Sequence, residues 1–240
     1  RNVRPAAPMS SGFPRRVVCL TEETTEILYR IGAADLVVGV SGYTVRPPEA
    51  RKKPRVSAFI SADIPKIEAL SPDLVLTFSD LQADIVRDLM KRGHTVVGFN
   101  QRSIAEILQV VRMVGALVGF AIAAATLADE LEAGLDRVRE RAARLPRRPR
   151  VFFEEWDEPL ISGIRWVSEV VEIAGGEDVF PEMRERHDGP GRIVTPASVI
   201  DRAPEVILAS WCGKKVRPER IKSRPGWDAI PAVRDGRIHE

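Results

Sequence analysis

Two pairs of adjacent glutamates stand just after the first apolar run in each half of the sequence. Glu22 and Glu23 follow residues 17–20, and Glu154 and Glu155 hold the corresponding place further along the chain. Two carboxylates at one cleft can act as general acid and base if burial raises the pKa of one of them. They can also accept hydrogen bonds from ligand amides, or favour a helix N-terminus through its dipole. The residue pattern leaves catalysis, binding and helix capping open.

Aromatic residues make up only 6% of the chain, yet five of them stand in predicted loops or at the ends of strands and not inside helices. Flat apolar rings from two halves of a protein suit a bulky, partly apolar ligand. A ring in such a place can instead close the end of the hydrophobic core, and both interpretations stay open for each ring. The five residues concerned are Tyr43, Phe59, Phe78, Trp156 and Trp211.

The other reactive side chains match no catalytic or metal-binding motif. The sequence contains no Gly-x-Ser-x-Gly, no Gly-x-Gly-x-x-Gly and no Walker loop. His94, His187 and His239 stand singly, so we expect no zinc site and no resident cofactor. His187 remains a candidate axial ligand for the metal of a bound porphyrin or corrinoid. Cys212 lies in a basic segment that suits a reactive thiol, but we expect a buried and unreactive one.

The composition is that of an ordinary globular protein. The 240 residues are 44% hydrophobic and 29% charged, and the length allows one or two domains. A formal net charge of +2 is too small for a nucleic-acid-binding surface, so we expect no nucleic-acid partner. Cys19 and Cys212 fit either redox compartment. No apolar run has the form of a membrane span or a signal peptide, which leaves a cytoplasmic location open.

Short apolar runs alternate with segments of helical periodicity, and this alternation predicts an α/β fold with parallel sheets. Ser103, followed by Glu106 three residues later, predicts a capping box at a helix start. Ligands of such sheets bind beyond the carboxyl ends of the strands, where the glutamates and rings named above are expected. Predicted strands cover residues 17–20, 36–40, 74–78 and 95–99, and predicted helices cover 23–31, 64–70, 82–91 and a stretch from Ser103.

A long helical stretch separates two halves of similar pattern. Residues 120–145 are rich in Ala, Leu, Glu and Arg, which predicts a single helix. Residues 70–76 are echoed by residues 202–208, each a proline-containing turn with an acidic residue followed by an apolar run. We therefore expect an N-terminal α/β lobe over residues 15–118, a bridging helix over 119–145 and a C-terminal α/β lobe over 146–240.

The pattern as a whole resembles the class III periplasmic-binding-protein superfamily, which delivers cobalamin, ferric siderophores or haem to ATP-binding-cassette (ABC) importers. The resemblance implies two Rossmann-like lobes joined by one long helix, with a ligand cleft between the lobes and no catalysis. It also implies an ABC transporter permease as partner and a location in the periplasm or at the cell surface, and we expect a monomer. The segments that carry the resemblance are residues 24–26, 38–41, 67–75, 173–176, 203–207, 225–227 and 232–237.

Within this superfamily the sequence is most similar to cobalamin-binding members, through residues 154–157, 160–166 and 211–215. The resemblance implies that rings from both lobes hold the corrin while the four glutamates accept hydrogen bonds from its peripheral amides. A ferric siderophore or haem is the alternative ligand, and a carboxylate-dependent hydrolase or lyase is the alternative from another class. For haem or a siderophore the natural contacts are Tyr43, His187 and Arg165. The expected ligand-binding residues are Glu22, Glu23, Tyr43, Phe59, Phe78, Glu154, Glu155, Trp156, Arg165 and Trp211.

The sequence departs from the family pattern in two places. Acidic residues that dock the permease are usual in the family, but Pro65 and Ala197 stand at the matching positions, with Asp63 and Asp201 as the candidate substitutes. The family also continues through a C-terminal helix. Because this sequence stops at Glu240, we expect the C-terminal lobe to lack that last helix.

Overall fold

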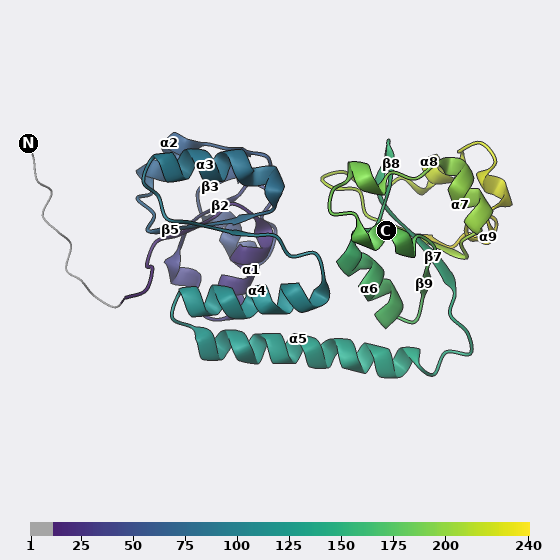
Figure 1. The fold of residues 1–240 in the computed structure, drawn as a ribbon, viewed down its shortest axis with the longest axis horizontal. Helices are drawn as coiled ribbons and strands as arrows, with labels where there is room; N and C mark the ends of the chain where they lie inside the picture. Colours follow the sequence, from purple (N-terminus) through teal and green to yellow (C-terminus); the bar gives the residue numbers. More distant parts are fainter. Residues whose placement is uncertain (1–11) are drawn as a thin grey trace, which may run out of the picture. The chain divides into compact units, whose positions relative to one another are not determined.

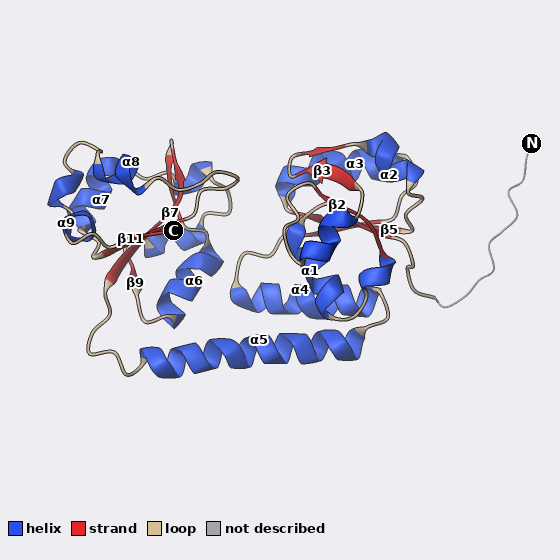
Figure 2. Cartoon of the chain, turned by 180° about the vertical axis from the view of Figure 1, so that it is seen from behind, coloured by secondary structure: helices blue, strands red, loops and turns tan. Residues whose placement is uncertain are grey.

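Two separate β-sheets, each flanked by helices, form the centres of two α/β units (Figure 1; Figure 2). The computed structural model describes residues 12–240. Unit 1 contains the residues up to Gln101 together with Leu108–Asp129, and unit 2 contains Arg102–Ile107 and Glu130–Glu240. The α/β fold class predicted from the sequence is confirmed.

Unit 1 is built on a six-stranded sheet in the order β4-β3-β2-β1-β5-β6. β3 and β4 pair antiparallel, and the other neighbouring strands pair parallel. Its strands are β1 (Val17–Cys19), β2 (Val37–Ser41), β3 (Arg55–Ala58), β4 (Ser61–Ala62), β5 (Leu74–Phe78) and β6 (Val96–Phe99). Its shorter helices are α1 (Glu22–Arg30), α2 (Ile64–Ala69) and α3 (Ala83–Lys91).

The central strands of unit 1 are buried on both faces. Val17, Val18 and Cys19 of β1 have no exposed surface. Val18 belongs to a core cluster with Ile67 of α2 and Leu89 of α3, so these two helices cover one face of the sheet. Parallel strands covered on both faces need apolar residues at successive positions, which explains the unbroken apolar runs of the sequence.

Two longer helices follow β6. α4 (Ile104–Leu117) begins with the predicted capping box, because Ser103 Oγ accepts the Glu106 N–H at 3.2 Å and Glu106 Oε2 accepts the Ser103 N–H at 2.9 Å. α5 (Ala121–Ala142) has 22 residues and a length of about 33 Å, and the chain passes from unit 1 into unit 2 within it. None of the helices in the described range has the length and apolar character that crossing a membrane requires.

Unit 2 is built on a sheet in the order β11-β10-β7-β8, with β9 also paired to β7. β8 runs antiparallel to β7, whereas β9 and β10 run parallel to it. Its strands are β7 (Arg150–Asp157), β8 (Leu160–Ser162), β9 (Glu177–Asp178), β10 (Val206–Ala209) and β11 (Ile238–His239). Its helices are α6 (Arg165–Ile173), α7 (Pro196–Arg202), α8 (Pro218–Lys222) and α9 (Pro231–Arg234).

An aromatic cluster anchors the core of unit 2. The ring of Phe152 in β7 lies edge-on to those of Phe180 and Trp227, with centroids 5.5 Å and 6.4 Å away. All three side chains are almost fully buried. Figure 2 shows the strands of this unit lying among its helices, as burial of such a cluster requires.

The two cysteines have different environments, and neither is in a disulfide. Cys19 in β1 is fully buried, and burial raises the pKa of its thiol to about 12. Cys212 is exposed in the loop after β10, so the expectation of a buried thiol at this position is wrong. The chain makes a turn at Cys212 and Gly213, and Gly213 has a left-handed backbone with φ of 73°.

Candidate functional site

The topology of each sheet marks one place where a ligand is expected. In unit 1 the chain leaves β1 for β2 on one side and later returns to β5 on the other. In unit 2, β7 lies between β10 on one side and β8 with β9 on the other. Loops diverge at such switch points and leave room beyond the carboxyl ends of the strands. The side chains at these ends are therefore the candidates for ligand contact.

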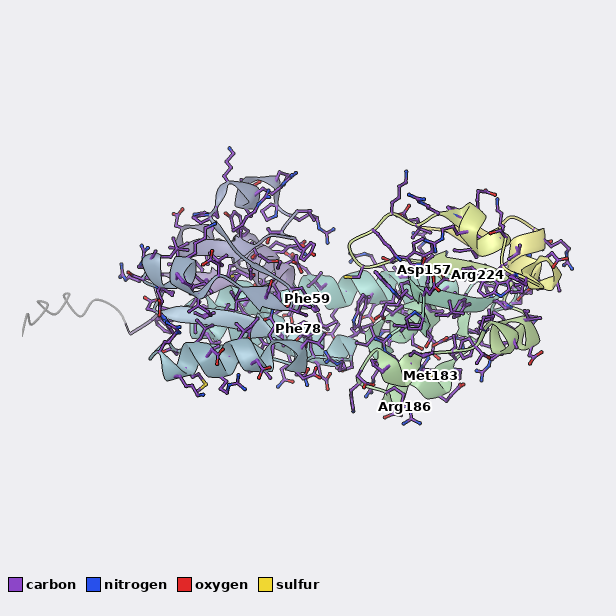
Figure 3. All side chains as sticks on the ribbon, turned by 90° about the horizontal axis from the view of Figure 1, so that it is seen from above. Phe59, Phe78, Asp157, Met183, Arg186 and Arg224 are labelled. Atoms are coloured by element: carbon purple, nitrogen blue, oxygen red, sulfur yellow. The ribbon has the colours of Figure 1, made fainter. Side chains whose placement is uncertain are left out.

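Three of the aromatic residues predicted to contact a ligand lie at or just after the carboxyl ends of strands in unit 1. Tyr43 follows β2 and is 54% exposed, Phe59 follows β3, and Phe78 ends β5. Figure 3 shows Phe59 and Phe78 at the same edge of the unit. The structure thus places all three rings in loops or strand ends, as the sequence pattern predicts.

The buried side chain of Gln82 joins the segments that carry two of these rings. Its Nε2 donates to the Phe59 carbonyl oxygen at 2.5 Å, and its Oε1 accepts the Phe78 N–H at 3.1 Å. The same Nε2 lies 3.5 Å from the carbonyl oxygen of Leu20, just past β1. Gln82 ends a short 3-10 turn, Asp80–Gln82, and has no exposed surface. A buried amide whose donor and acceptor are both used holds the segments it joins in one arrangement.

Backbone strain accompanies this arrangement. Phe59 and Ser79 have φ angles of 35° and 67°, in the left-handed region. Such a conformation costs a residue other than glycine about 1–3 kcal/mol. The hydrogen bond from Gln82 to the Phe59 carbonyl offsets part of this cost. The loops are therefore shaped by their surroundings and not by local preference.

Three exposed aliphatic side chains in the same loops were missed by sequence reasoning. Val45, Ile60 and Leu81 are 61%, 69% and 59% exposed. Each lies within three residues of one of the rings named above, so unit 1 presents aliphatic and aromatic side chains together. Single exposed apolar residues are common on proteins, whereas several of them at the same end of a sheet are candidates for ligand contact. Val45 and Leu81 follow the predicted strands 36–40 and 74–78, which is the signal in the sequence, whereas no strand was predicted before Ile60.

The first glutamate pair, Glu22 and Glu23, forms hydrogen bonds with residues at or just after the ends of β1 and β2. Ser41 Oγ donates to Glu22 Oε1 at 2.8 Å and accepts the Tyr43 N–H at 3.2 Å, so Glu22 helps to position the Tyr43 loop. Thr21 Oγ1 donates to Glu23 Oε1 at 2.7 Å. Burial raises the pKa of Glu23 although the Thr21 hydrogen bond opposes the shift. Both glutamates lie in the first turn of α1.

Glu154 is an internal structural residue of unit 2. Its carboxylate has no exposed surface, and it accepts two hydrogen bonds from Arg224, at 2.6 and 2.8 Å. The indole Nε1 of Trp211 donates to it at 2.9 Å, and Trp211 is only 4% exposed within the core. The predicted ligand contacts of Glu154 and Trp211 do not fit this geometry, because β7 continues through Asp157 and keeps Glu154 inside the sheet.

Glu155 pairs with a different arginine. Arg192 is 3% exposed, and its two terminal nitrogens donate to Glu155 at 2.6 and 2.8 Å. The side chain of Glu155 remains 31% exposed, so one edge of it can meet a ligand. Since each of the two glutamates is neutralised by its own arginine, they do not form a pair of catalytic carboxylates.

Trp156 belongs to a charged cluster at the end of β7. Its indole Nε1 donates to the Glu158 carbonyl at 2.8 Å, and the Lys214 ammonium lies 3.9 Å from its ring centroid. Lys214 also donates to Asp157, which is paired with Arg220 as well. Burial works against ionisation of Asp157, but Lys214 and Arg220 hold its pKa below the usual range.

The start of α6 presents two further side chains. Arg165 Nε pairs with Glu169 Oε1 at 3.0 Å, one helical turn along. Trp166 is 39% exposed and was not among the predicted contacts. The position of Trp166 directly after the β7–β8 hairpin is the feature that identifies it as a candidate contact.

His187 is exposed in the loop between residues 185 and 190. Within residues 12–240 no group of three or more His, Cys, Asp or Glu side chains is arranged to hold a metal ion.

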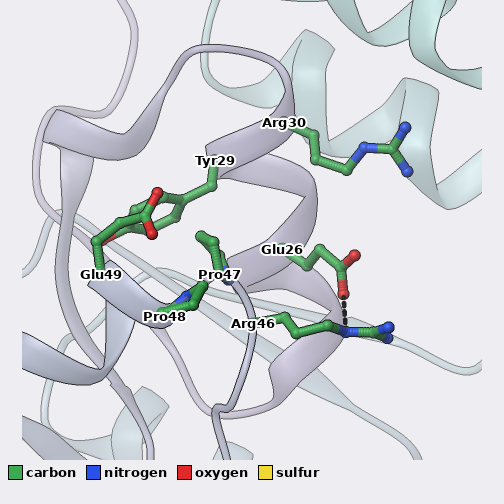
Figure 4. A pocket seen from close by; sticks show the side chains of 7 residues that line it. All are labelled: Glu26, Tyr29, Arg30, Arg46, Pro47, Pro48 and Glu49. Carbon is green, nitrogen blue, oxygen red and sulfur yellow. Dashed lines mark ion pairs between the residues drawn. The ribbon is translucent and has the colours of Figure 1, made fainter.

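Each unit also has a cavity of small-molecule size. In unit 1 a cavity of about 340 Å³ lies between α1 and residues 46–49, where Arg46 pairs with Glu26 at 3.3 Å (Figure 4). It contains none of the predicted contacts. In unit 2 a cavity of about 510 Å³ lies beside Asp157 and Arg220, at the carboxyl end of β7.

The chain is similar to periplasmic and substrate-binding proteins. The model of the family described as periplasmic binding protein matches residues 17–240. The vitamin B12-binding protein of Yersinia pestis is 29% identical over 198 residues, which make up 81% of this chain and 69% of that protein. The uncharacterized ABC transporter substrate-binding lipoprotein YvrC of Bacillus subtilis is 25% identical over 237 residues, 95% of this chain and 72% of that protein.

A solved structure shares the fold over nearly the whole chain. It is described as a possible iron-binding, periplasmic solute-binding protein of Staphylococcus epidermidis. The TM-score is 0.80 at 25% identity, and the match covers 94% of this chain and 89% of that one.

The Glu154 network can be tested by its effect on stability. Glu154→Gln leaves the Arg224 guanidinium without its carboxylate, so we expect the free energy of unfolding to fall by about 3 kcal/mol. Urea unfolding of the variant and of the wild type measures this. Glu158→Gln, an exposed change in the same hairpin, should stay within about 0.5 kcal/mol. An equal effect of the two substitutions contradicts the structural role of Glu154.

The raised pKa of Glu23 predicts a pH dependence. The folded state binds this proton more tightly than the unfolded state, so the contribution to stability is lost as pH rises through the two pKa values. Glu23→Gln removes this loss. In urea unfolding, the variant should therefore gain stability relative to the wild type on going from about pH 4 to about pH 7. A difference that is constant or shrinks over this range shows that Glu23 is not shifted upward.

Proposed function

The chain belongs to the periplasmic binding protein family, and on this premise we propose that it binds cobalamin or a related corrinoid for an ABC importer. Membership confirms the resemblance and the substrate-binding role predicted from the sequence. The vitamin B12-binding relative of Yersinia pestis supports the choice of ligand. The lipoprotein of Bacillus subtilis supports a location in the periplasm or at the cell surface.

The observation that carries the ligand class is the exposed apolar group beyond β2, β3 and β5. Tyr43, Val45, Ile60 and Leu81 are each more than half exposed. Burial of apolar surface contributes about 25 cal/mol per Å², so a ligand must be broad to cover such a group. A sugar or a bare ion leaves these side chains in water. A macrocycle with flat faces covers them.

Unit 2 carries polar groups that suit the periphery of such a ligand. The exposed edge of Glu155 can accept hydrogen bonds from side-chain amides of the ligand, and Arg165 can donate them. Trp166 adds an exposed ring at the start of α6. Glu23, Glu154 and Trp211 act from inside the units, as supports of these surfaces.

A porphyrin or a ferric siderophore is the second candidate. Tyr43 and His187 are exposed, and a phenolate or an imidazole can each ligate iron. The possible iron-binding protein of Staphylococcus epidermidis supports this alternative. The carboxylate-dependent enzyme has weaker support, because the second glutamate pair is occupied by arginines and the family is one of binding proteins.

Two exposed acids are proposed to meet the permease. Asp63 precedes α2 and caps it by accepting the Lys66 N–H at 3.0 Å. Asp201 lies in α7 and is also exposed. They stand two and four residues from Pro65 and Ala197, where the family usually has its docking acids.

A thermal-shift and absorbance screen tests the ligand class. The probes are cobalamin, cobinamide, haemin and a ferric hydroxamate siderophore. A ligand present at 100 times its dissociation constant stabilises the folded state by about 2.7 kcal/mol, which gives a clear rise in midpoint. We expect this rise with cobalamin. A protein that responds to none of the probes refutes the proposal.

Substitution of Tyr43 separates the two ligand classes. Tyr43→Ala removes an exposed ring, so corrinoid affinity should fall about tenfold in calorimetric titration. Tyr43→Phe keeps the ring and should bind the corrinoid as the wild type does, whereas an iron ligated by the phenolate loses that bond. Ile122→Ala, at an 86% exposed position on α5, is the control. Full corrinoid affinity in Tyr43→Ala contradicts the proposed contact.

A further inference from the structure

Lys214 and Arg220 share one carboxylate at the end of β7. Lys214 donates to Asp157 Oδ1, and Arg220 Nη1 lies 3.1 Å from Asp157 Oδ2. The side chain of Asp157 is 2% exposed, whereas those of Lys214 and Arg220 are 37% and 51% exposed. The carboxylate is buried in unit 2, and the two cations lie at its surface. The three groups therefore present one net positive charge to the solvent.

Two neighbouring arginines, Arg192 and Arg224, belong to ion pairs that have no net positive charge. Arg224 is bound through both terminal nitrogens to Glu154, and Arg192 is bound in the same way to Glu155. Each of these pairs is one cation with one anion. Arg220 contacts Asp157 through Nη1, and a guanidinium has five N–H donors. Of these four cations, Lys214 and Arg220 have capacity for a further anion.

The cavity of about 510 Å³ adjoins Arg220. Its walls combine Leu160, Ile193 and Val194 with three prolines, and Arg220 and Arg224 bring guanidinium groups to it. Its volume falls in the range of small-molecule pockets. Apolar walls with a cationic end suit a group that has an apolar body and an anionic terminus. Glu158 also lines this cavity and weakens its attraction for anions.

We propose that Arg220 and Lys214 bind an oxyanion carried by the ligand, either a phosphodiester or a carboxylate. The inference rests on the proposed function and adds the charge of the ligand to it. A planar guanidinium binds two oxygens of one oxyanion, and an ammonium binds as a point charge beside it. The Lys214 ammonium lies 3.9 Å from the Trp156 ring centroid and shares the Asp157 carboxylate with Arg220. In a corrinoid the oxyanion is the phosphodiester of the nucleotide loop, and in a porphyrin it is a propionate.

Paired ligands that differ in the oxyanion test this proposal. Calorimetric titration compares cobalamin with cobinamide, which lacks the phosphodiester, and haemin with its dimethyl ester. Arg220→Gln should weaken binding of cobalamin about tenfold and leave cobinamide within about twofold. Arg220→Lys should retain part of the preference. Glu158→Gln should strengthen cobalamin binding. Lys222→Gln removes the same charge from the same helix and should change neither affinity.

The outcomes separate this inference from the proposed function. If the wild type binds haemin and not corrinoids, the same loss with haemin, absent with its ester, assigns the oxyanion to a carboxylate. Equal weakening of both members of a pair by Arg220→Gln, or no weakening, overturns the inference while ligand binding stands. A wild-type protein that binds none of the four probes overturns both. Unfolding midpoints of the ligand-free variants confirm that each titration uses folded protein.

Discussion

A buried polar side chain at each switch point is the constraint on which the proposed binding surfaces depend. In unit 1 the amide of Gln82 joins the exits of β3 and β5, and in unit 2 the carboxylate of Glu154 joins β7 to Trp211 and Arg224. The loops of a parallel sheet diverge at a switch point, so their positions must be fixed by contacts between them. A polar group in a dry environment does so because every hydrogen bond that it loses there is costly.

The two units use this constraint differently. The loops around Gln82 expose aliphatic and aromatic side chains, so unit 1 presents apolar surface that a ligand can cover. Beyond Glu154, Lys214 lies against the Trp156 ring and Arg220 pairs with Asp157, so unit 2 presents charged groups that can orient a ligand. A ligand with an apolar body and a polar periphery matches both kinds of surface. Hydrophobic area supplies most of the affinity in such sites, and a few polar groups supply orientation.

Local patterns in the sequence were sufficient to predict much of the fold. The runs that became β1 and β5 are apolar because both faces are covered, and the capping box at Ser103 is a contact within one turn. The exposed group in unit 1 was partly predictable, because Tyr43, Val45 and Leu81 follow predicted strands, whereas β3, which precedes Ile60, was not predicted. The role of Gln82 was not, since its partners Phe59 and Leu20 lie 23 and 62 residues away.

Glu154 shows the same limit more sharply. In the sequence it resembles its neighbour Glu155, but β7 continues through it, and its partner Arg224 lies 70 residues further along the chain. Burial of a charge is decided by such distant partners and not by local pattern. Cys212 was expected to be buried, but it is exposed in the turn after β10 that includes Gly213.

The most direct measurement is a calorimetric titration of cobalamin into Gln82→Leu and into the wild type. The substitution keeps the volume of the side chain and removes the hydrogen bonds that hold Phe59 and Phe78. We expect Gln82→Leu to fold and to bind cobalamin about tenfold more weakly, while Gln109→Leu, on the exposed side of α4, binds as the wild type does. Unchanged affinity in folded Gln82→Leu would contradict the claim that this buried amide organises the binding surface.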